Sequence, residues 1–80
     1  MDIDNLLLFA NNSIITIQYR EEEKDLIVPC TLNKSLCDVL SAKPIPKKSF
    51  THIYVWAIDI ADCKSIKIDT ITNWYIGHPR

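Results

Sequence analysis

Eighty residues, 48% apolar and 24% charged, are enough for one small globular domain but not for two. Nine Lys and Arg against ten Asp and Glu give a formal net charge of −1. This balance excludes the overall basic field that draws whole proteins to nucleic acid or anionic lipid, so any anion site is a local patch. We therefore treat residues 1–80 as a single domain.

The chain begins with a predicted short helix over Ile3–Ala10. Apolar side chains recur there at helical spacing. Asp2 and Asp4 lie near its start, where the helix dipole favours negative charge. Asn11 and Asn12 follow as a stop signal, because Asn tolerates the left-handed conformation that ends helices. Such a short helix needs tertiary packing to persist.

Residues 14–20 alternate between apolar and polar side chains, which predicts a half-buried strand. Its inward-facing residues are Ile15, Ile17 and Tyr19. A charged reversal at residues 21–25 leads to a second strand at residues 26–28. We expect that strand to end or reach a sheet edge at Pro29, because proline cannot donate to a ladder. The two strands predict a hairpin.

Residues 33–48 are the least regular part of the sequence. Ser35 and Asp38 have the spacing of a capping box for a short helix. Pro44 and Pro46 then require extended backbone in the residues before them. We interpret this stretch as a long connection over the sheet.

Residues 52–60 give the strongest strand signal. Both alternating faces are apolar, which predicts a central strand covered on both sides, with Tyr54 and Trp56 packed inside. A turn at residues 62–64 precedes a strand at residues 65–69, and residues 70–76 form the last strand.

The order of these elements predicts a mostly β, α+β fold. A sheet of four or five short strands would curl into a small barrel of the SH3 or Sm type, plugged by the N-terminal helix.

Four short blocks resemble, in order and internal spacing, those of small bacterial WYL domains, over roughly three quarters of the chain. The blocks are Ile-Gln-Tyr-Arg at 17–20, Ile-Val-Pro at 27–29, Ile-Tyr-Val-Trp-Ala at 53–57 and Lys-Ser-Ile-Lys-Ile-Asp-Thr-Ile at 64–71. Ile53 and Val55 stand where the family has Trp and Leu. Lys64, Lys67 and Thr70 replace its arginines.

WYL domains are regulatory ligand-sensing modules, often attached to winged-helix transcription factors or CRISPR-associated proteins. The resemblance implies a non-enzymatic module that binds a nucleotide or single-stranded nucleic acid through a local basic patch. Lysine keeps the positive charge of the family's arginines but lacks their bidentate fork. The residues that the resemblance places at the ligand are Tyr19, Arg20, Tyr54, Lys64 and Lys67.

Each of these candidates has a structural alternative. Arg20 could instead form an ion pair with Glu22 or Glu23 across the turn, the commoner fate of a surface arginine. Lys64 and Lys67 could be solvated residues that protect a strand edge.

A rival hypothesis is a protein-interaction or self-assembly module without a small ligand. Trp74 and Tyr75, near the end of the last strand, are the expected exposed pair and the candidate contact for a partner protein or a second copy. Tyr54, Trp56 and Trp74 could form a stacking platform for bases, although for Tyr54 and Trp56 packing in the core is the favoured alternative.

Cys30, Cys37 and Cys63 form an odd set without the closely spaced pairs of a zinc site, and His52 and His78 do not complete one. We expect no metal and no cofactor. The sequence has no nucleophile elbow, phosphate loop or His-Glu zinc helix, so an enzyme is not expected.

The cysteine pattern favours reduced thiols in a cytoplasmic protein, because small secreted domains usually carry several paired cysteines. The apolar run at residues 6–10 is too short to span a bilayer, and no basic leader precedes it. We expect no membrane partner.

Overall fold

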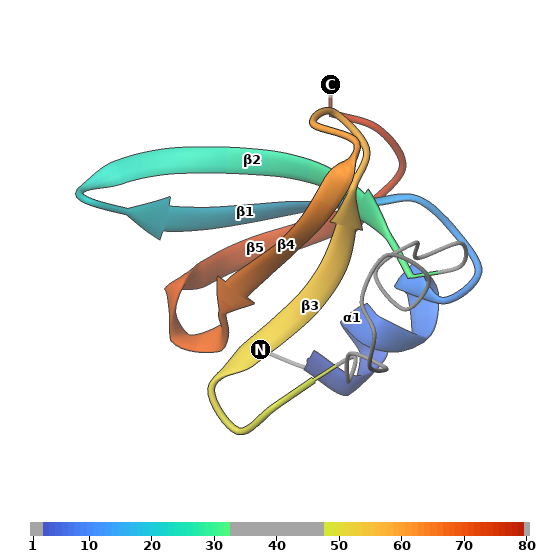
Figure 1. Ribbon diagram of the computed structural model, residues 1–80, viewed down its shortest axis with the longest axis horizontal. Coiled ribbons are helices and arrows are strands. Elements are labelled where there is room, and N and C mark those ends of the chain that lie inside the picture. The colour runs from blue at the N-terminus through green and yellow to red at the C-terminus, as the bar shows by residue number, and fades with distance from the viewer. Residues whose placement is uncertain (1–2, 33–47, 80) are drawn as a thin grey trace.

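The computed structural model describes residues 3–32 and 48–79. Within these residues, one helix precedes five strands that form a single antiparallel sheet in the order β4-β3-β2-β1-β5. The described elements, shown in Figure 1, are α1 (Ile3–Ala10), β1 (Ile15–Glu21), β2 (Lys24–Thr31), β3 (His52–Ala57), β4 (Asp62–Lys67), the 3₁₀ helix η1 (Ile68–Thr70) and β5 (Ile71–Ile76). The predicted mostly β, α+β class is confirmed.

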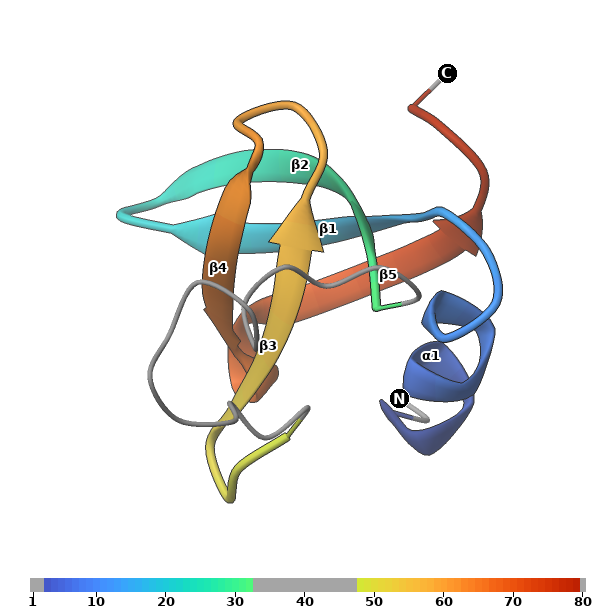
Figure 2. The ribbon, with the colours of Figure 1, turned by 45° about the vertical axis from the view of Figure 1, so that its right-hand side comes forward.

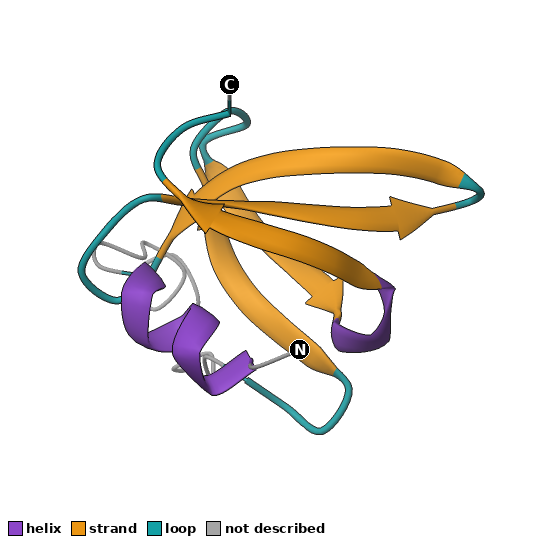
Figure 3. Ribbon diagram, turned by 180° about the vertical axis from the view of Figure 1, so that it is seen from behind, coloured by secondary structure: helices purple, strands orange, loops and turns teal. Residues whose placement is uncertain are grey.

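Helix α1 has the bounds that the sequence predicts and packs its Leu6 and Ala10 side chains into the core. The carbonyl group of its last residue, Ala10, is hydrogen-bonded to residues at the end of β2. The carbonyl oxygen of Ala10 accepts hydrogen bonds from the Leu32 backbone N–H at 2.8 Å and from Thr31 Oγ1 at 3.2 Å. These bonds satisfy a carbonyl that a helix end leaves unpaired. They hold α1 against the sheet, as Figure 3 shows.

Strands β1 and β2 form the predicted hairpin. Glu21 pairs with Lys24, so the connection has two residues, Glu22 and Glu23. Their φ angles are 52° and 64°. Two positive φ values in a two-residue loop define a type I′ turn, whose twist matches that of the strands but which favours Asn and Gly. Two glutamates therefore hold a conformation that costs each of them steric strain.

Replacing the turn by Asn-Gly should stabilise the protein. In the double variant Glu22→Asn/Glu23→Gly, we expect the free energy of unfolding to rise by about 1 kcal/mol, because Asn and Gly adopt left-handed backbone at lower cost. Urea denaturation followed by circular dichroism measures the change. The reverse sequence, Glu22→Gly/Glu23→Asn, gives the same charge change as a control. A double variant less stable than the parent would contradict a type I′ turn.

Of the two outcomes expected at Pro29, the end of the strand is wrong, because β2 continues to Thr31. The other outcome, a sheet edge, agrees with the register, since β2 pairs with β3 only at Cys30 and Thr31. Pro29 lies opposite Thr16 of β1, and its carbonyl accepts the Ile58 N–H at 2.9 Å on the side of β3. Ladder bonds in antiparallel sheets alternate between the two neighbours. The missing N–H of Pro29 therefore points toward β3, where the pairing with β2 is ending, and the ladder to β1 loses no bond.

The predicted strand at residues 52–60 stops earlier, at Ala57. Residues 58–61 form the turn, where Ala61 has a φ of 51°. Strand β4 then starts at Asp62, within the segment that we predicted to be the turn. The reversal was placed too late because the apolar residues 58 and 60 continue the alternation of β3 beyond its end.

The prediction that both faces of this strand are covered is also wrong. One face is fully buried and consists of Ile53, Val55 and Ala57. The other face bears Tyr54 and Trp56, which are half-buried, and Ile60 beyond the strand is exposed. Among the described elements, helix α1 lies on the side of the sheet that Ile53, Val55 and Ala57 face, and not on the side of Tyr54 and Trp56.

A short connection forces the sheet to curl. Strands β4 and β5 are the two edges of the sheet, yet only η1 separates them. Neighbouring strands lie about 4.8 Å apart, so in a flat sheet these edges would be about 19 Å apart. The chain from Lys67 to Ile71 spans about 14 Å at most. The sheet therefore coils until its edges approach, as Figures 1 and 2 show.

The concave side of this coil holds the hydrophobic core. Residues from α1 and all five strands contribute, and η1 adds Ile68 at the margin. The buried apolar residues are Leu6, Ala10, Ile15, Ile17, Tyr19, Val28, Cys30, Leu32, Ile53, Val55, Ala57, Ile66 and Ile71. The inward face predicted for β1 is confirmed.

The expectation of reduced thiols is wrong for Cys63, which is disulfide-bonded. Cys30 is free and buried, and Cys37 lies outside the described residues. Burial among apolar side chains, and secondly the nearby Asp59 carboxylate, raise the pKa of the Cys30 thiol to about 12.

The predicted helix after Ser35 and the extended stretch around Pro44 lie outside the described residues. Within the part of the chain that is described, no helix has the length and apolar character needed to cross a membrane.

Candidate functional site

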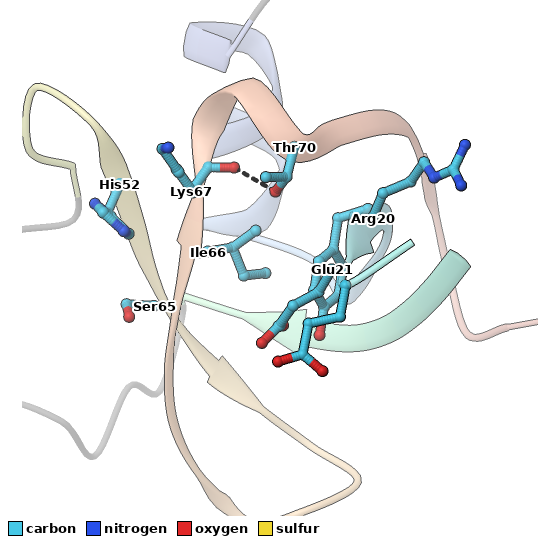
Figure 4. Close-up of a pocket in the computed structure, with 9 residues that line it drawn as sticks. Arg20, Glu21, His52, Ser65, Ile66, Lys67 and Thr70 are labelled. Atoms are coloured by element: carbon cyan, nitrogen blue, oxygen red, sulfur yellow. Dashed lines mark hydrogen bonds between the residues drawn. The ribbon is translucent and has the colours of Figure 1, made fainter. Parts of the chain in front are cut away.

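A hollow of about 360 Å³ opens between the end of β1 and the β4 edge of the sheet. Figure 4 shows its walls. Strand β4 lies at one edge of the sheet, beyond β3 and β2 from β1. It approaches the end of β1 because the sheet is coiled. The lining residues are Tyr19, Arg20, Glu21, Glu22, His52, Ser65, Ile66, Lys67 and Thr70. We call this site the Tyr19 hollow.

Tyr19 forms the base of the hollow and is linked to a cation from β4. Its side chain is only 6% exposed. The Nζ atom of Lys64 lies 5.7 Å from the centroid of the Tyr19 ring. Lys64 reaches the ring because it pairs with the buried Val55 and so points to the concave face of the sheet. A cation over an aromatic face contributes about 0.5–1 kcal/mol at a partly exposed position.

Arg20 follows Tyr19 on β1 and therefore points to the opposite, solvent-exposed face. Its Nε atom lies 3.3 Å from Asp25 Oδ1, and an Nη atom donates to the Glu23 carbonyl oxygen at 3.3 Å. The ion pair expected with Glu22 or Glu23 is thus made with Asp25 instead, because Asp25 is the residue opposite Arg20 in the β1–β2 register.

Arg20 also borders a second hollow of about 440 Å³ on the outer face of the hairpin. Tyr19 and Arg20 line both hollows, and Asp25 lines only the second. In Figure 4 the guanidinium group points to the side of the Tyr19 hollow that is remote from Lys67.

Lys67 lies on the rim opposite Arg20. Its Nζ atom is 3.8 Å from Asp69 Oδ2, and both side chains are more than half exposed. The Thr70 hydroxyl donates to the Lys67 carbonyl oxygen at 2.6 Å and fixes the turn that ends β4. Figure 4 shows this bond and the side chain of Lys67 directed toward His52.

The rim also carries the carboxylates of Glu21 and Glu22. The positive charges of Arg20 and Lys67 are therefore nearly balanced within the hollow itself. An ion pair between exposed side chains contributes about 0–1 kcal/mol, so the pairs at the rim can be exchanged for another anion at low cost.

Tyr54, the fifth predicted ligand residue, does not line the Tyr19 hollow. It lies on the outer face of β3, opposite Ser65, and its hydroxyl donates to Ser49 Oγ at 3.4 Å. Tyr54 thus borders Ser65, which is in the lining, without facing the base of the hollow.

The pair Trp74 and Tyr75, expected to be exposed, is half-buried. Trp74 packs at the margin of the core, and its ring lies 5.8 Å from that of Phe9 in a tilted arrangement of 41°. Phe9 of α1 therefore covers part of the Trp74 side chain. Because Phe9 is itself 42% exposed, the two aromatic residues lie together at the protein surface.

Three further residues of the hollow were not among the predicted ligand residues: His52, Ser65 and Thr70. His52 lies opposite Lys67 in the β3–β4 register, and its Nδ1 atom is 2.7 Å from Thr51 Oγ1. The alternation of β3 was visible in the sequence, but only the register with β4 brings His52 to Lys67.

Among the residues that the structure describes, no three His, Cys, Asp or Glu side chains cluster as a metal site requires. Comparisons of the chain with protein-family models, curated proteins and solved structures gave no match.

Proposed function

We propose that this chain is a non-enzymatic binding module that takes a small anionic ligand, a nucleotide or the end of a single-stranded nucleic acid, at the Tyr19 hollow. The observation that carries the proposal is the meeting of β1 and β4 at this hollow, where Tyr19, Arg20 and Lys67 are in the lining and the Nζ atom of Lys64 lies 5.7 Å from the Tyr19 ring centroid. Sequence similarity to WYL domains supports the same four residues. A regulatory role follows from that similarity alone.

The positive and negative side chains around the Tyr19 hollow determine the size of anion that we propose as its ligand. Arg20 and Lys67 are the cations in the lining, and each pairs with an exposed carboxylate, Asp25 and Asp69 respectively, that a phosphate would have to displace. Lys64, beside the Tyr19 ring, would add a third positive charge next to the hollow. The carboxylates of Glu21 and Glu22 would repel a long polyanion that runs across the rim. A compact anion with one or two phosphates fits this arrangement better than a long strand.

The finer fold that we propose is a small barrel of the SH3 or Sm type. The coiled five-stranded sheet, the 3₁₀ turn between its edges and the contact of η1 with β1 all support it. In such a barrel the Tyr19 hollow lies where β4 approaches the end of β1.

Binding is tested by isothermal titration calorimetry with adenosine 5′-monophosphate and with a short oligothymidylate. Removing both cations in Lys64→Ala/Lys67→Ala should weaken binding about tenfold or more, because each charge-assisted contact with phosphate contributes about 1.5–3 kcal/mol. The affinity of the parent protein should fall as salt is raised.

The matched control removes positive charge elsewhere. Lys48→Ala removes a partly exposed lysine whose Nζ atom pairs with Asp4 of α1 and which is not in the lining of the Tyr19 hollow, so this variant should bind as the parent does. Equal affinity of the double variant and the parent would refute the site. No detectable heat from either ligand would refute the ligand class.

A further inference from the structure

Strand β5 is an edge of the sheet that carries no charged residue. Its sequence is Ile-Thr-Asn-Trp-Tyr-Ile. The opposite edge, β4, bears Asp62, Lys64 and Lys67, and charged side chains of this kind protect an edge against pairing with another chain. Among the described strands, β5 pairs only with β1. It is the edge that lacks protection.

The hydrogen-bond alternation identifies which backbone groups of β5 are directed outward. The Gly77 N–H donates to the Ile14 carbonyl at 2.8 Å, and the register continues with Tyr75 opposite Thr16. Bonded and non-bonded pairs alternate in an antiparallel ladder. Gly77 and Tyr75 therefore direct their backbone groups toward β1, whereas Trp74 and Ile76 direct theirs to the open side.

Apolar side chains accompany these outward backbone groups. Ile76 is 54% exposed, and Phe9 of α1 lies against Trp74 with 42% of its surface exposed. Figure 3 shows β5 running from η1 toward α1, so that the helix extends the surface beside the strand. We call Phe9, Trp74, Tyr75 and Ile76 the β5 edge surface.

We propose that the β5 edge surface binds a second copy of this chain, with the two β5 strands antiparallel about a two-fold axis. The register follows from the outward groups: Trp74 pairs with the partner's Ile76, and Ile76 with the partner's Trp74. This register makes two hydrogen-bonded pairs and places Tyr75 opposite the partner's Tyr75.

Charge favours a second copy as the occupant. Because β5 has no charged side chain, two copies bring no like charges opposite each other across the strands. The aromatic and β-branched side chains of Trp74 and Ile76 form favourable cross-strand pairs. The acidic turn at Glu22 lies at the far end of β1, and the Tyr19 hollow lies toward β4, so the dimer leaves both exposed. The dimer does not depend on the proposed ligand.

Sedimentation velocity of the full chain over a range of concentrations measures the association. The parent should form a dimer that dissociates on dilution. Ile76→Lys should raise the dissociation constant at least tenfold, because each copy would then place a charge against the partner's Trp74. Ile76→Pro should act similarly by removing an outward N–H that β1 does not use. Ile27→Lys, at an isoleucine with 51% exposure on β2, is the control and should still dimerise.

Cross-linking tests the register separately. Cysteines at opposed non-bonded positions are close enough for a disulfide. Tyr75→Cys should therefore give a covalent dimer on mild oxidation, whereas Asn73→Cys should not. A parent that stays monomeric at every concentration overturns the proposal, even if it binds an apolar extended peptide instead. A dimer unchanged in both Ile76 variants also overturns it.

Discussion

Replacing Ile53 by alanine is expected to lower the free energy of unfolding by about 2–5 kcal/mol. Ile53 is fully buried on the concave face of β3 and lies opposite Ile66 of β4. Truncation removes buried apolar surface and leaves a cavity where the two strands meet the core. Because a domain of this size has a total stability of about 4–12 kcal/mol, the variant should be close to unfolding at ordinary temperature.

Urea denaturation measures this loss, with Ile27→Ala as the control. Ile27 is 51% exposed on β2, and its truncation should change stability by less than about 0.5 kcal/mol. If Ile53→Ala fails to fold, Ile53→Val should still fold with a loss of about 0.5–1.5 kcal/mol. A loss below 0.5 kcal/mol in Ile53→Ala would contradict the burial of this face of β3.

The stability of the protein is also expected to fall in alkaline solution because of Cys30. The pKa of its thiol rises from 9.0 to about 12 on folding, chiefly through burial and then through Asp59. Above about pH 9 the unfolded chain loses a thiol proton that the folded chain retains. The retained proton on Cys30 therefore makes its full contribution to the free energy of unfolding below pH 9. That contribution is lost as the pH rises toward 12, by about 1.4 kcal/mol per pH unit and about 4 kcal/mol in all.

Chemical denaturation at a series of alkaline pH values measures this slope, and Cys30→Ala separates it from the titration of other groups. The variant will be less stable at neutral pH, but its stability should fall less steeply above pH 9. Alkylation gives a second readout, since native Cys30 should react with iodoacetamide about a thousandfold more slowly than the unfolded chain at pH 8. Equal slopes in parent and variant would contradict a buried, protonated thiol.

Local pattern predicted the helix and the first strand well because both show a single apolar face. Ile3–Ala10 and residues 14–20 needed no information from distant parts of the chain. The strand that contains Pro29 was cut short because the cost of a proline depends on which neighbour its missing N–H would face. That neighbour, β3, lies more than twenty residues further along the sequence. The local pattern does not contain it.

The sequence predicted which residues belong to the candidate site, but not how their side chains are arranged in space. Tyr19, Arg20 and Lys67 do line one hollow, and Lys64 contacts Tyr19. The resemblance to WYL domains placed Tyr54 with them, although the alternation of its strand predicted a side chain packed inside; the structure puts Tyr54 on the other face of β3, outside the lining. The partners of the cations also depend on register, as the pairing of Arg20 with Asp25 illustrates.

Binding at the Tyr19 hollow can be followed residue by residue in a two-dimensional amide NMR titration of the isotope-labelled protein with adenosine 5′-monophosphate. We expect saturable shifts at the amides of Tyr19, Arg20, Lys64 and Lys67, with Lys48 unaffected. Spectra that do not change with the nucleotide, or shifts confined to residues outside the Tyr19 hollow, would contradict this expectation.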